Sequence, residues 1–235
     1  MIDALKLRAN VLPTRESLAR SSFHGSSIET RCRACHGPTE TLGHVIGKCP
    51  ITQANRVARH DNVCAYLAMR LRQLCASRTH LKGGQVIREY QVSIRPGELP
   101  GVSDTQFLKP DIAVILNDRI VLIEVSVVFE TEGFNNAEEN SLLQVRRSKL
   151  RKYALLRRLL LNRHGKPCTI RTCIVGCRGG WLASNNKVFK DLGEPLTPMD
   201  ANACVERAVR GSLIVFKRFA HRATGPVVRH LGRRD

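Results

Sequence analysis

The sequence has no long apolar run. No stretch of its 235 residues approaches the roughly 18 apolar residues of a membrane helix, and its first residues lack the apolar core of a signal peptide. We therefore expect an intracellular protein with no membrane partner. Internal repeats and low-complexity basic arms are also missing, which is unlike a repeat array or a typical ribosomal-type protein.

Acidic residues are scarce. The chain has 20 Asp and Glu against 38 Lys and Arg, and this formal net charge of +18 is spread along the sequence. Such a balance favours a polyanionic partner, most simply a nucleic acid. The hydrophobic content of 43% is enough for a folded domain with a core of its own.

The cysteines fall into two groups. The chain contains nine, and most of those after residue 50 lie in apolar-periodic segments, as reduced core cysteines do in the cytosol or nucleus. These are Cys64, Cys75, Cys168, Cys173 and Cys204. Cys173 and Cys177, although spaced C-x3-C, are better explained as a core and a loop cysteine than as ligands.

The earlier group has the spacing of a metal site. Cys32, Cys35, His44 and Cys49 are arranged C-x2-C-x8-H-x4-C, which predicts a tetrahedral zinc knuckle. A chance cluster is the alternative, and His36, next to Cys35, is a poor substitute ligand. Such a unit would need its ion to fold. It could contact nucleic acid or serve as a purely structural clip.

Residues 108–130 predict a β-hairpin. Two apolar runs flank Asn117-Asp118, and each run contains a carboxylate, Asp111 at the start of the first strand and Glu124 deep in the second. An ionised carboxylate in a buried strand is costly unless it is paired, hydrogen-bonded or bound to a metal. Two of them on adjacent strands indicate a divalent cation.

The remaining pattern predicts a mixed α/β fold. We expect a helix over 52–77 with Val57 on its apolar face, a strand over 85–94, the hairpin, a helix over 137–163, a strand over 168–176 and a helix over 199–222. Glu89, on the first strand, is a weaker candidate ligand.

Lys149 falls on the apolar stripe of the helix that follows the hairpin, with Leu142, Tyr153 and Leu156. A lysine there must reach solvent or face a counter-charge. Packing of this helix on the sheet would bring it toward Asp111 and Glu124. Two carboxylates that hold Mg²⁺ and a lysine that orients a water form a set for phosphodiester hydrolysis. The simpler explanation is a capping Asp, a Glu paired with a surface Arg and a snorkelling Lys.

Pro110-Asp111, then twelve intervening residues and then Glu124, resembles the PD-(D/E)xK nuclease signature. One departure is Ser126, which stands where the signature lysine would be. In one branch that lysine is displaced onto the following helix. This branch is the restriction-like endonuclease region of site-specific non-LTR retrotransposon polyproteins of the ribosomal-DNA-inserting type.

The chain is similar to that branch over nearly its whole length. The matching motifs are LPTRESLAR at 12–20, the CCHC knuckle with ETLGHVIGKCP at 40–50, Arg59-His60-Asp61, Lys109-Pro110-Asp111, Glu124-Val125, Lys149-Leu-Arg-Lys152-Tyr153 and the Gly-Cys-Arg-Gly-Gly-Trp turn at 176–181. Glu124 stands where many relatives have Asp.

The resemblance implies a function. Asp111, Glu124 and Lys149 would be the catalytic set, supported by Lys152 and Tyr153, with Mg²⁺ at the carboxylates and Zn²⁺ in the knuckle. The activity would be nicking of target DNA to prime reverse transcription, in the nucleus.

The resemblance also implies partners and a division of the chain. Element RNA and a missing N-terminal reverse transcriptase region would be partners besides DNA, and Arg59-His60 would contact DNA or the active site. The expected segments are a lead-in (1–31), the knuckle (32–50), a restriction-endonuclease-like core (51–225) and a basic tail (226–235). The alternative is a nucleic-acid-binding module with a vestigial nuclease centre.

Overall fold

A computed structural model describes residues 2–21, 29–131 and 140–223. The chain forms two compact units, one of residues 1–57 and 210–235 and one of residues 58–209. The four segments predicted from the sequence were defined by motifs and not by compactness, so they stay a prediction. The tail predicted at 226–235 lies outside the described residues. No helix among the described residues is long and apolar enough to cross a membrane.

The first unit is built from short helices and the ends of two long ones. Its elements are α1 (Ile2–Arg8), α2 (Arg15–Ser21), the short helical turns η1 (His44–Lys48) and η2 (Pro50–Thr52), the beginning of α3 (Gln53–Ser77) and the end of α5 (Pro198–Ala223). Arg31 and Thr39 form an isolated antiparallel bridge at the base of the turn that contains the first two cysteines of the knuckle.

A buried carboxylate fastens this turn. Glu40 has no exposed surface, and its oxygens accept hydrogen bonds from the Arg33 guanidinium at 2.6–3.0 Å and from the backbone N–H groups of Arg33 and Arg15. Burial raises the pKa of Glu40, but these donors outweigh it and lower the pKa below its usual value. The contact ties the start of α2 to the cysteine turn.

The second unit contains a four-stranded mixed sheet in the order β1-β4-β5-β6. The strands are β1 (Gln85–Arg88), β4 (Ile112–Ile115), β5 (Ile120–Val128) and β6 (Cys168–Gly176); β2 (Val92–Ile94) and β3 (Gln106–Leu108) pair separately. β4 and β5 are antiparallel neighbours, which confirms the predicted hairpin, and β6 runs parallel to β5.

The single strand predicted over 85–94 is wrong. It divides into β1 and β2, which belong to different sheets, because Glu89 between them has a positive φ of 51°. A residue in this conformation cannot continue an extended strand. Glu89 is exposed, and its carboxylate pairs with Lys109 at 2.8 Å.

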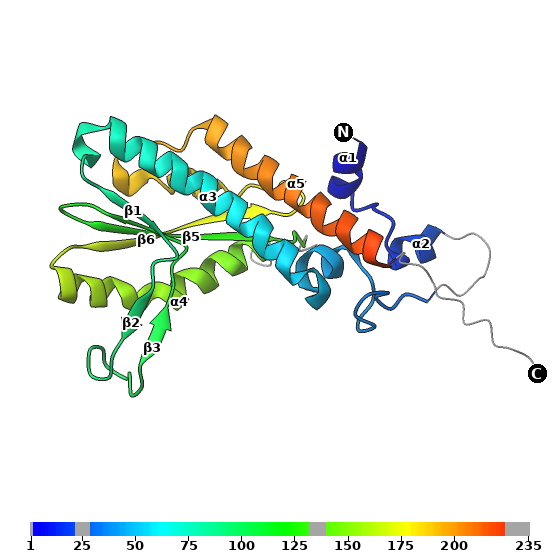
Figure 1. The fold of residues 1–235 in the computed structure, drawn as a ribbon, viewed down its shortest axis with the longest axis horizontal. Helices are drawn as coiled ribbons and strands as arrows, with labels where there is room; N and C mark the ends of the chain where they lie inside the picture. Colours follow the sequence, from blue (N-terminus) through cyan, green and yellow to red (C-terminus); the bar gives the residue numbers. More distant parts are fainter. Residues whose placement is uncertain (1, 22–28, 132–139, 224–235) are drawn as a thin grey trace, which may run out of the picture. The chain divides into compact units, whose positions relative to one another are not determined.

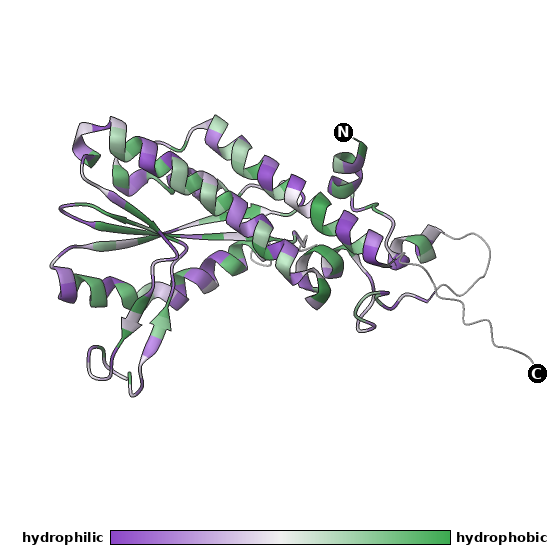
Figure 2. Cartoon of the chain, viewed as in Figure 1, coloured by the Kyte–Doolittle hydropathy of each residue, from purple (hydrophilic) through white to green (hydrophobic). Residues whose placement is uncertain are grey.

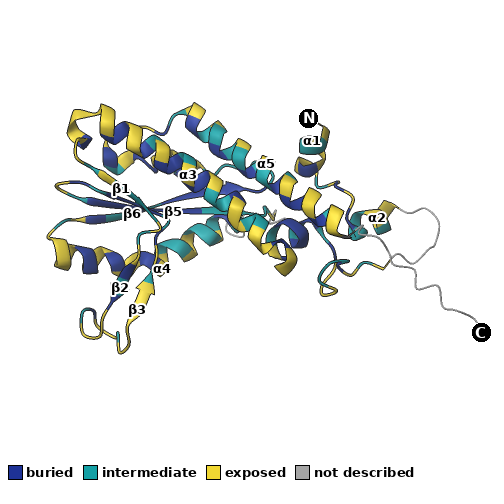
Figure 3. Ribbon diagram, viewed as in Figure 1, coloured by how far each residue is buried: buried dark blue, intermediate teal, exposed yellow. Residues whose placement is uncertain are grey.

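Alternate residues of the central strands pack on opposite faces of the sheet. Ile112, Val114 and Ile123 pack with α3 and α5, whereas Ala113 and Leu122 pack with α4 (Ser141–His164). Figure 1 shows α4 on one side of this sheet and the parts of α3 and α5 that belong to the unit on the other. The strands between them are largely buried (Figure 3), and the helices carry polar residues among apolar ones (Figure 2).

The three long helices match their predicted ranges closely. The first residues of the helix predicted over 137–163 lie outside the described residues; α4 begins after Asn140, whose side chain accepts a bond from Leu142 N, and is capped after His164 by Gly165, with φ of 64°. Val57 is 51% exposed, so its predicted inward position is wrong. The core that this face of α3 contacts begins only at Val63.

Two neighbouring leucines of α4 test this packing. Leu156 is fully buried in the core between α4 and the sheet, whereas Leu155 is 45% exposed. Leu156→Ala should lower the free energy of unfolding by about 2–5 kcal/mol, because it removes buried methyl groups and leaves a cavity. Leu155→Ala should change it by less than about 0.5 kcal/mol. Urea denaturation followed by circular dichroism measures both changes. Equal losses of stability in the two variants would contradict this packing of α4 on the sheet.

Candidate active site and candidate metal centre

Asp111 and Glu124 meet at the end of the hairpin ladder. Ile112 pairs with Ile123, so the next position places Asp111 opposite Glu124. The Asp111 backbone N–H donates to Glu124 Oε1 at 3.1 Å, and the Val125 N–H donates to Asp111 Oδ2 at 2.7 Å. Each carboxylate is therefore held by the backbone of the other strand.

Lys149 completes this group from α4. Glu124 alternates with Ile123 and Val125 along β5, so its side chain lies on the face that α4 covers. Lys149 Nζ lies 2.8 Å from Glu124 Oε2, which confirms the position predicted from the helix stripe. Ser126, at the usual lysine position, is only half-buried. The catalytic role of the three residues stays a prediction.

The two carboxyl groups have opposite pKa shifts. Burial, followed by the charge of Asp111, raises the pKa of Glu124, and Lys149 offsets part of this. Burial also raises the pKa of Asp111, but the hydrogen bond and charge of His60 and the Val125 N–H outweigh it and lower that pKa. Paired acids in different environments are typical of catalytic and metal sites.

His60 and Cys64 approach Asp111 from α3. His60 Nε2 lies 3.5 Å from Asp111 Oδ1 and 3.3 Å from the Val125 carbonyl oxygen, and Cys64 Sγ lies 3.6 Å from His60 Nε2. One ligand atom from each of His60, Cys64 and Asp111 fits within 4.8 Å of the others. Asp111 and then Cys64 raise the pKa of His60 to about 11, so the imidazole is charged beside the carboxylate.

Sequence reasoning had assigned Cys64 to the core and missed its contact with His60. The i, i+4 spacing of the two residues on α3 was the available signal. The approach of both to Asp111 depends on how α3 packs on the sheet, and no local pattern gives it.

The supporting residues differ in their surroundings. Tyr153 is 2% exposed and donates to the Lys109 carbonyl oxygen at 3.2 Å. Burial and then the charges of Glu124 and Asp111 raise its pKa. Lys152 is exposed, with Nζ 4.9 Å from the centre of the Tyr153 ring. Arg59 is 5% exposed, which leaves little of its surface for DNA.

The predicted knuckle residues form a second cluster, in the first unit. Ligand atoms of Cys32, Cys35, His44 and Cys49 lie within 4.8 Å of one another, with Cys35 Sγ 3.3 Å from His44 Nε2 and Cys32 Sγ 4.0 Å from Cys49 Sγ. Metal–sulfur bonds of about 2.3 Å in a tetrahedron separate ligand atoms by roughly 3.8 Å. The cluster therefore fits a zinc ion. His36 is exposed and is not one of the four.

The hairpin site fits a harder ion. Asp111 and Glu124 supply carboxylate oxygens, and the Val125 carbonyl oxygen is adjacent, all of which suit Mg²⁺. An ionised carboxylate has about four acceptor positions, so each retains capacity beyond the bonds described. A charged His60 has no free nitrogen lone pair, so beside this site it is a hydrogen-bond donor and not a metal ligand.

Comparison with known proteins identifies homologues among retrotransposon polyproteins. No protein-family model matches the chain. It is 30% identical over 231 residues to a retrovirus-related Pol polyprotein of a type-1 retrotransposable element R2 from Popillia japonica, covering 95% of this chain and 42% of that protein. The Pol polyprotein of the type-2 element R2DM from Drosophila melanogaster is 26% identical, covering 94% of this chain and 18% of that protein. A type-1 R2 polyprotein from Nasonia vitripennis is also 26% identical, with 91% and 18% covered.

The chain thus spans less than half of the length of these relatives. Its homologues are R2 non-LTR retrotransposon Pol polyproteins, and nearly the whole chain aligns with a region of each of them. This supports a retrotransposon-related function. The resemblance inferred from the motifs is confirmed at this level.

The contact between Lys149 and Glu124 can be tested by stability. Lys149→Met removes the only side-chain cation within bonding distance of Glu124 among the described residues and leaves a fully buried carboxyl group whose remaining donors are the Asp111 N–H and the Tyr153 hydroxyl. We expect a loss of about 2 kcal/mol at pH 7 in chelator, less than for a fully buried pair because the Lys149 side chain is 27% exposed. Lys152→Met, an exposed control, should change stability by less than about 0.5 kcal/mol. If Lys149→Met left the free energy of unfolding unchanged, the contact between Lys149 and Glu124 would not be formed in solution.

Proposed function

We propose that this chain is the DNA endonuclease module of a non-LTR retrotransposon polyprotein and that it nicks target DNA by Mg²⁺-dependent phosphodiester hydrolysis. The observation that carries the proposal is the chain of contacts from Lys149 to the fully buried Glu124 and on to Asp111. The net charge of +18 supports a polyanionic substrate. The R2 homologues support the setting in a retrotransposon polyprotein.

The architecture supports a restriction-endonuclease-like core. A β4–β5 hairpin with one carboxylate just before β4 and one within β5, a parallel β6 beside it and helices on both faces match the element order of that fold. In this core the lysine comes from α4 and not from position 126. The side chain of Glu124 points to the face of the sheet that α4 covers. Lys149 of α4 can therefore reach the Glu124 carboxylate, as a lysine at position 126 of β5 would in the usual signature.

Each residue then has a defined task. Asp111 and Glu124 would hold Mg²⁺, which when bound polarises a phosphate and lowers the pKa of a water. Lys149 offsets the raised pKa of Glu124, so that this buried acid can serve as a ligand, and its ammonium is placed to orient a water or to balance negative charge that develops on the phosphate. Tyr153 supports the Lys109 carbonyl just before Pro110-Asp111. His60 positions Asp111 from the other face.

A nucleic-acid-binding module with a vestigial centre is the second candidate. One observation favours it: both oxygens of Glu124 already have donors within the chain, and Asp111 has its own from Val125 and His60. Such a group can be retained for stability alone. The two candidates share the charge, the fold and the knuckle and differ only in cleavage.

We further propose that Cys32, Cys35, His44 and Cys49 bind one Zn²⁺. The ion would contribute folding free energy to the small first unit and hold the turn that Glu40 fastens. This knuckle would contact DNA or element RNA, or serve as a clip within the polyprotein. Partners would then be target DNA, element RNA and the N-terminal reverse transcriptase region, and the site of action the nucleus.

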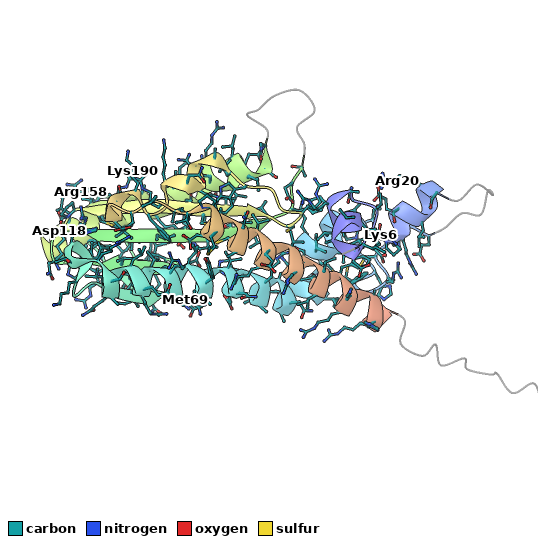
Figure 4. The ribbon with its side chains drawn as sticks, turned by 90° about the horizontal axis from the view of Figure 1, so that it is seen from above. Lys6, Arg20, Met69, Asp118, Arg158 and Lys190 are labelled. Carbon is teal, nitrogen blue, oxygen red and sulfur yellow. The ribbon has the colours of Figure 1, made fainter. Side chains whose placement is uncertain are left out.

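Supercoiled plasmid with Mg²⁺ tests the nuclease. Asp111→Ala should reduce nicking by at least about a thousandfold, because several kcal/mol of charge stabilisation depend on this ligand. DNA affinity should stay nearly unchanged, since Lys and Arg make the phosphate contacts. Asp118→Ala, on the turn of the same hairpin (Figure 4), is the control and should nick normally. An intact chain that binds DNA without nicking it would favour the vestigial centre.

Metal analysis tests the knuckle. The purified chain should hold about one zinc ion, and Cys32→Ser with Cys35→Ser should release it, because two of four ligands are lost. Cys168→Ser, at a buried cysteine of the second unit, should retain the ion and serves as the control. A folded native protein that contains no zinc would contradict the proposed zinc site.

A further inference from the structure

A small basic pocket lies between α4, β6 and the short helix η5 (Ala183–Lys187) of the second unit. Its volume is about 190 Å³. None of its lining residues is acidic, and the polar ones are Arg146, Arg157, Arg171, Thr172, Ser184 and Lys187. Four cations around so small a space favour an anionic ligand.

Most of this charge is not balanced by neighbours. Arg171 forms a bidentate pair with Asp191, both N–O distances being 2.6 Å, which fixes its guanidinium. Among the described residues, no carboxylate forms an ion pair with Arg146, Arg157 or Lys187. The pocket therefore combines one preorganised cation with three that are open to a further anion.

Two buried polar atoms of the lining also have no hydrogen-bond partner among the described residues. They are Arg146 Nε, a donor, and Ser184 Oγ, which can donate or accept. Buried polar groups are rarely left without a partner, and each such case calls for an explanation, such as a ligand or an ordered water. Both atoms belong to residues that line the same small space. A tetrahedral oxyanion would accept bonds from both.

The pocket is adjacent to the candidate active site. Thr172 is the register partner of Glu124 on the neighbouring strand, which places their backbones roughly 4.8 Å apart. Arg146 precedes Lys149 by three residues on α4, a spacing of roughly 5–6 Å on the helix surface. A DNA strand carries one phosphate per roughly 3.4 Å of helix axis. If one phosphate of a DNA strand lies at Asp111 and Glu124, a phosphate one or two nucleotides away on the same strand can therefore reach the pocket.

We propose that this pocket binds a backbone phosphate of the DNA strand next to the phosphate that is cleaved. The inference rests on the proposed function, because the carboxylate site defines which phosphate is cleaved. Arg146 and Arg157 grip the phosphate oxygens from α4 and Lys187 from η5, while the hydroxyls of Thr172 and Ser184 complete the contacts. The pocket fixes the register of the strand and carries no sequence preference of its own.

Helix α4 provides a matched pair of variants for this test. Arg146 and Arg157 line the pocket, whereas their neighbours Arg147 and Arg158 are exposed and do not line it (Figure 4 labels Arg158). Arg146→Gln with Arg157→Gln therefore removes the same charge from the same helix as Arg147→Gln with Arg158→Gln. The probe is a fluorescent DNA duplex titrated at several salt concentrations with Ca²⁺ in place of Mg²⁺, and nicking is assayed separately.

The pocket variant should bind the duplex roughly tenfold more weakly, as expected for the loss of charge-assisted contacts to one phosphate. The slope of log affinity against log salt should become less steep by about 0.9, the value for one phosphate. Plasmid nicking should fall with it. The control variant should keep its affinity within about twofold and its slope unchanged.

Equal losses in the two variants, or unchanged binding by the pocket variant, would overturn the proposal, because only general charge would then matter. Circular dichroism and the unfolding midpoint identify any variant that misfolds, in which case exposed Arg157→Gln is compared with Arg158→Gln alone. If the unmodified chain binds DNA but does not nick it with Mg²⁺, the proposed nuclease fails. The binding comparison still decides whether the pocket holds a phosphate.

Discussion

The second unit depends on how the chain accommodates Glu124, a carboxylate with no exposed surface in the middle of a central strand. Burial of such a group is tolerated only when neighbours supply donors or charge. Here the antiparallel partner supplies the Asp111 N–H, and the helix that covers this face supplies Lys149. The hairpin register, the packing of α4 and the position of Asp111 are therefore tied to a single side chain.

The same requirement explains which parts of the fold and site could be predicted. The hairpin, the three long helices and the CCHC spacing follow from local patterns, and Lys149 was found because a lysine on an apolar stripe needs a partner. The break at Glu89 was missed because its left-handed backbone leaves no mark in the apolar pattern. The contact of His60 and Cys64 with Asp111 depends on tertiary packing of α3, which no local pattern encodes.

Charge balance at the centre follows from this packing. Asp111 and Glu124 contribute two negative groups, and Lys149 from α4 and His60 from α3 contribute two cations from opposite faces of the sheet. Each acid thus has its own cation, and the pKa values of the two acids shift in opposite directions. The centre is consequently sensitive to both helices, and α3 also contributes the Asp61 carboxylate, 3.1 Å from His60 Nδ1. Displacement of either helix would change the pKa of the carboxyl group that it faces.

In the proposed function, binding and chemistry are assigned to different residues of α4. Lys149 points to the buried acid, Arg146 and Arg157 line the neighbouring pocket, and Arg147 and Arg158 face solvent. A single helix therefore offsets part of the raised pKa of a buried carboxyl group, presents cations to one small pocket and adds diffuse positive charge elsewhere. Diffuse charge raises affinity for any nucleic acid, whereas cations gathered in one pocket beside the strand that pairs with Glu124 would constrain where a DNA backbone lies. Under this proposal, the register of a DNA strand relative to the carboxylates would be set by the packing of α4 on β5 and β6, the same packing that the buried Glu124 requires.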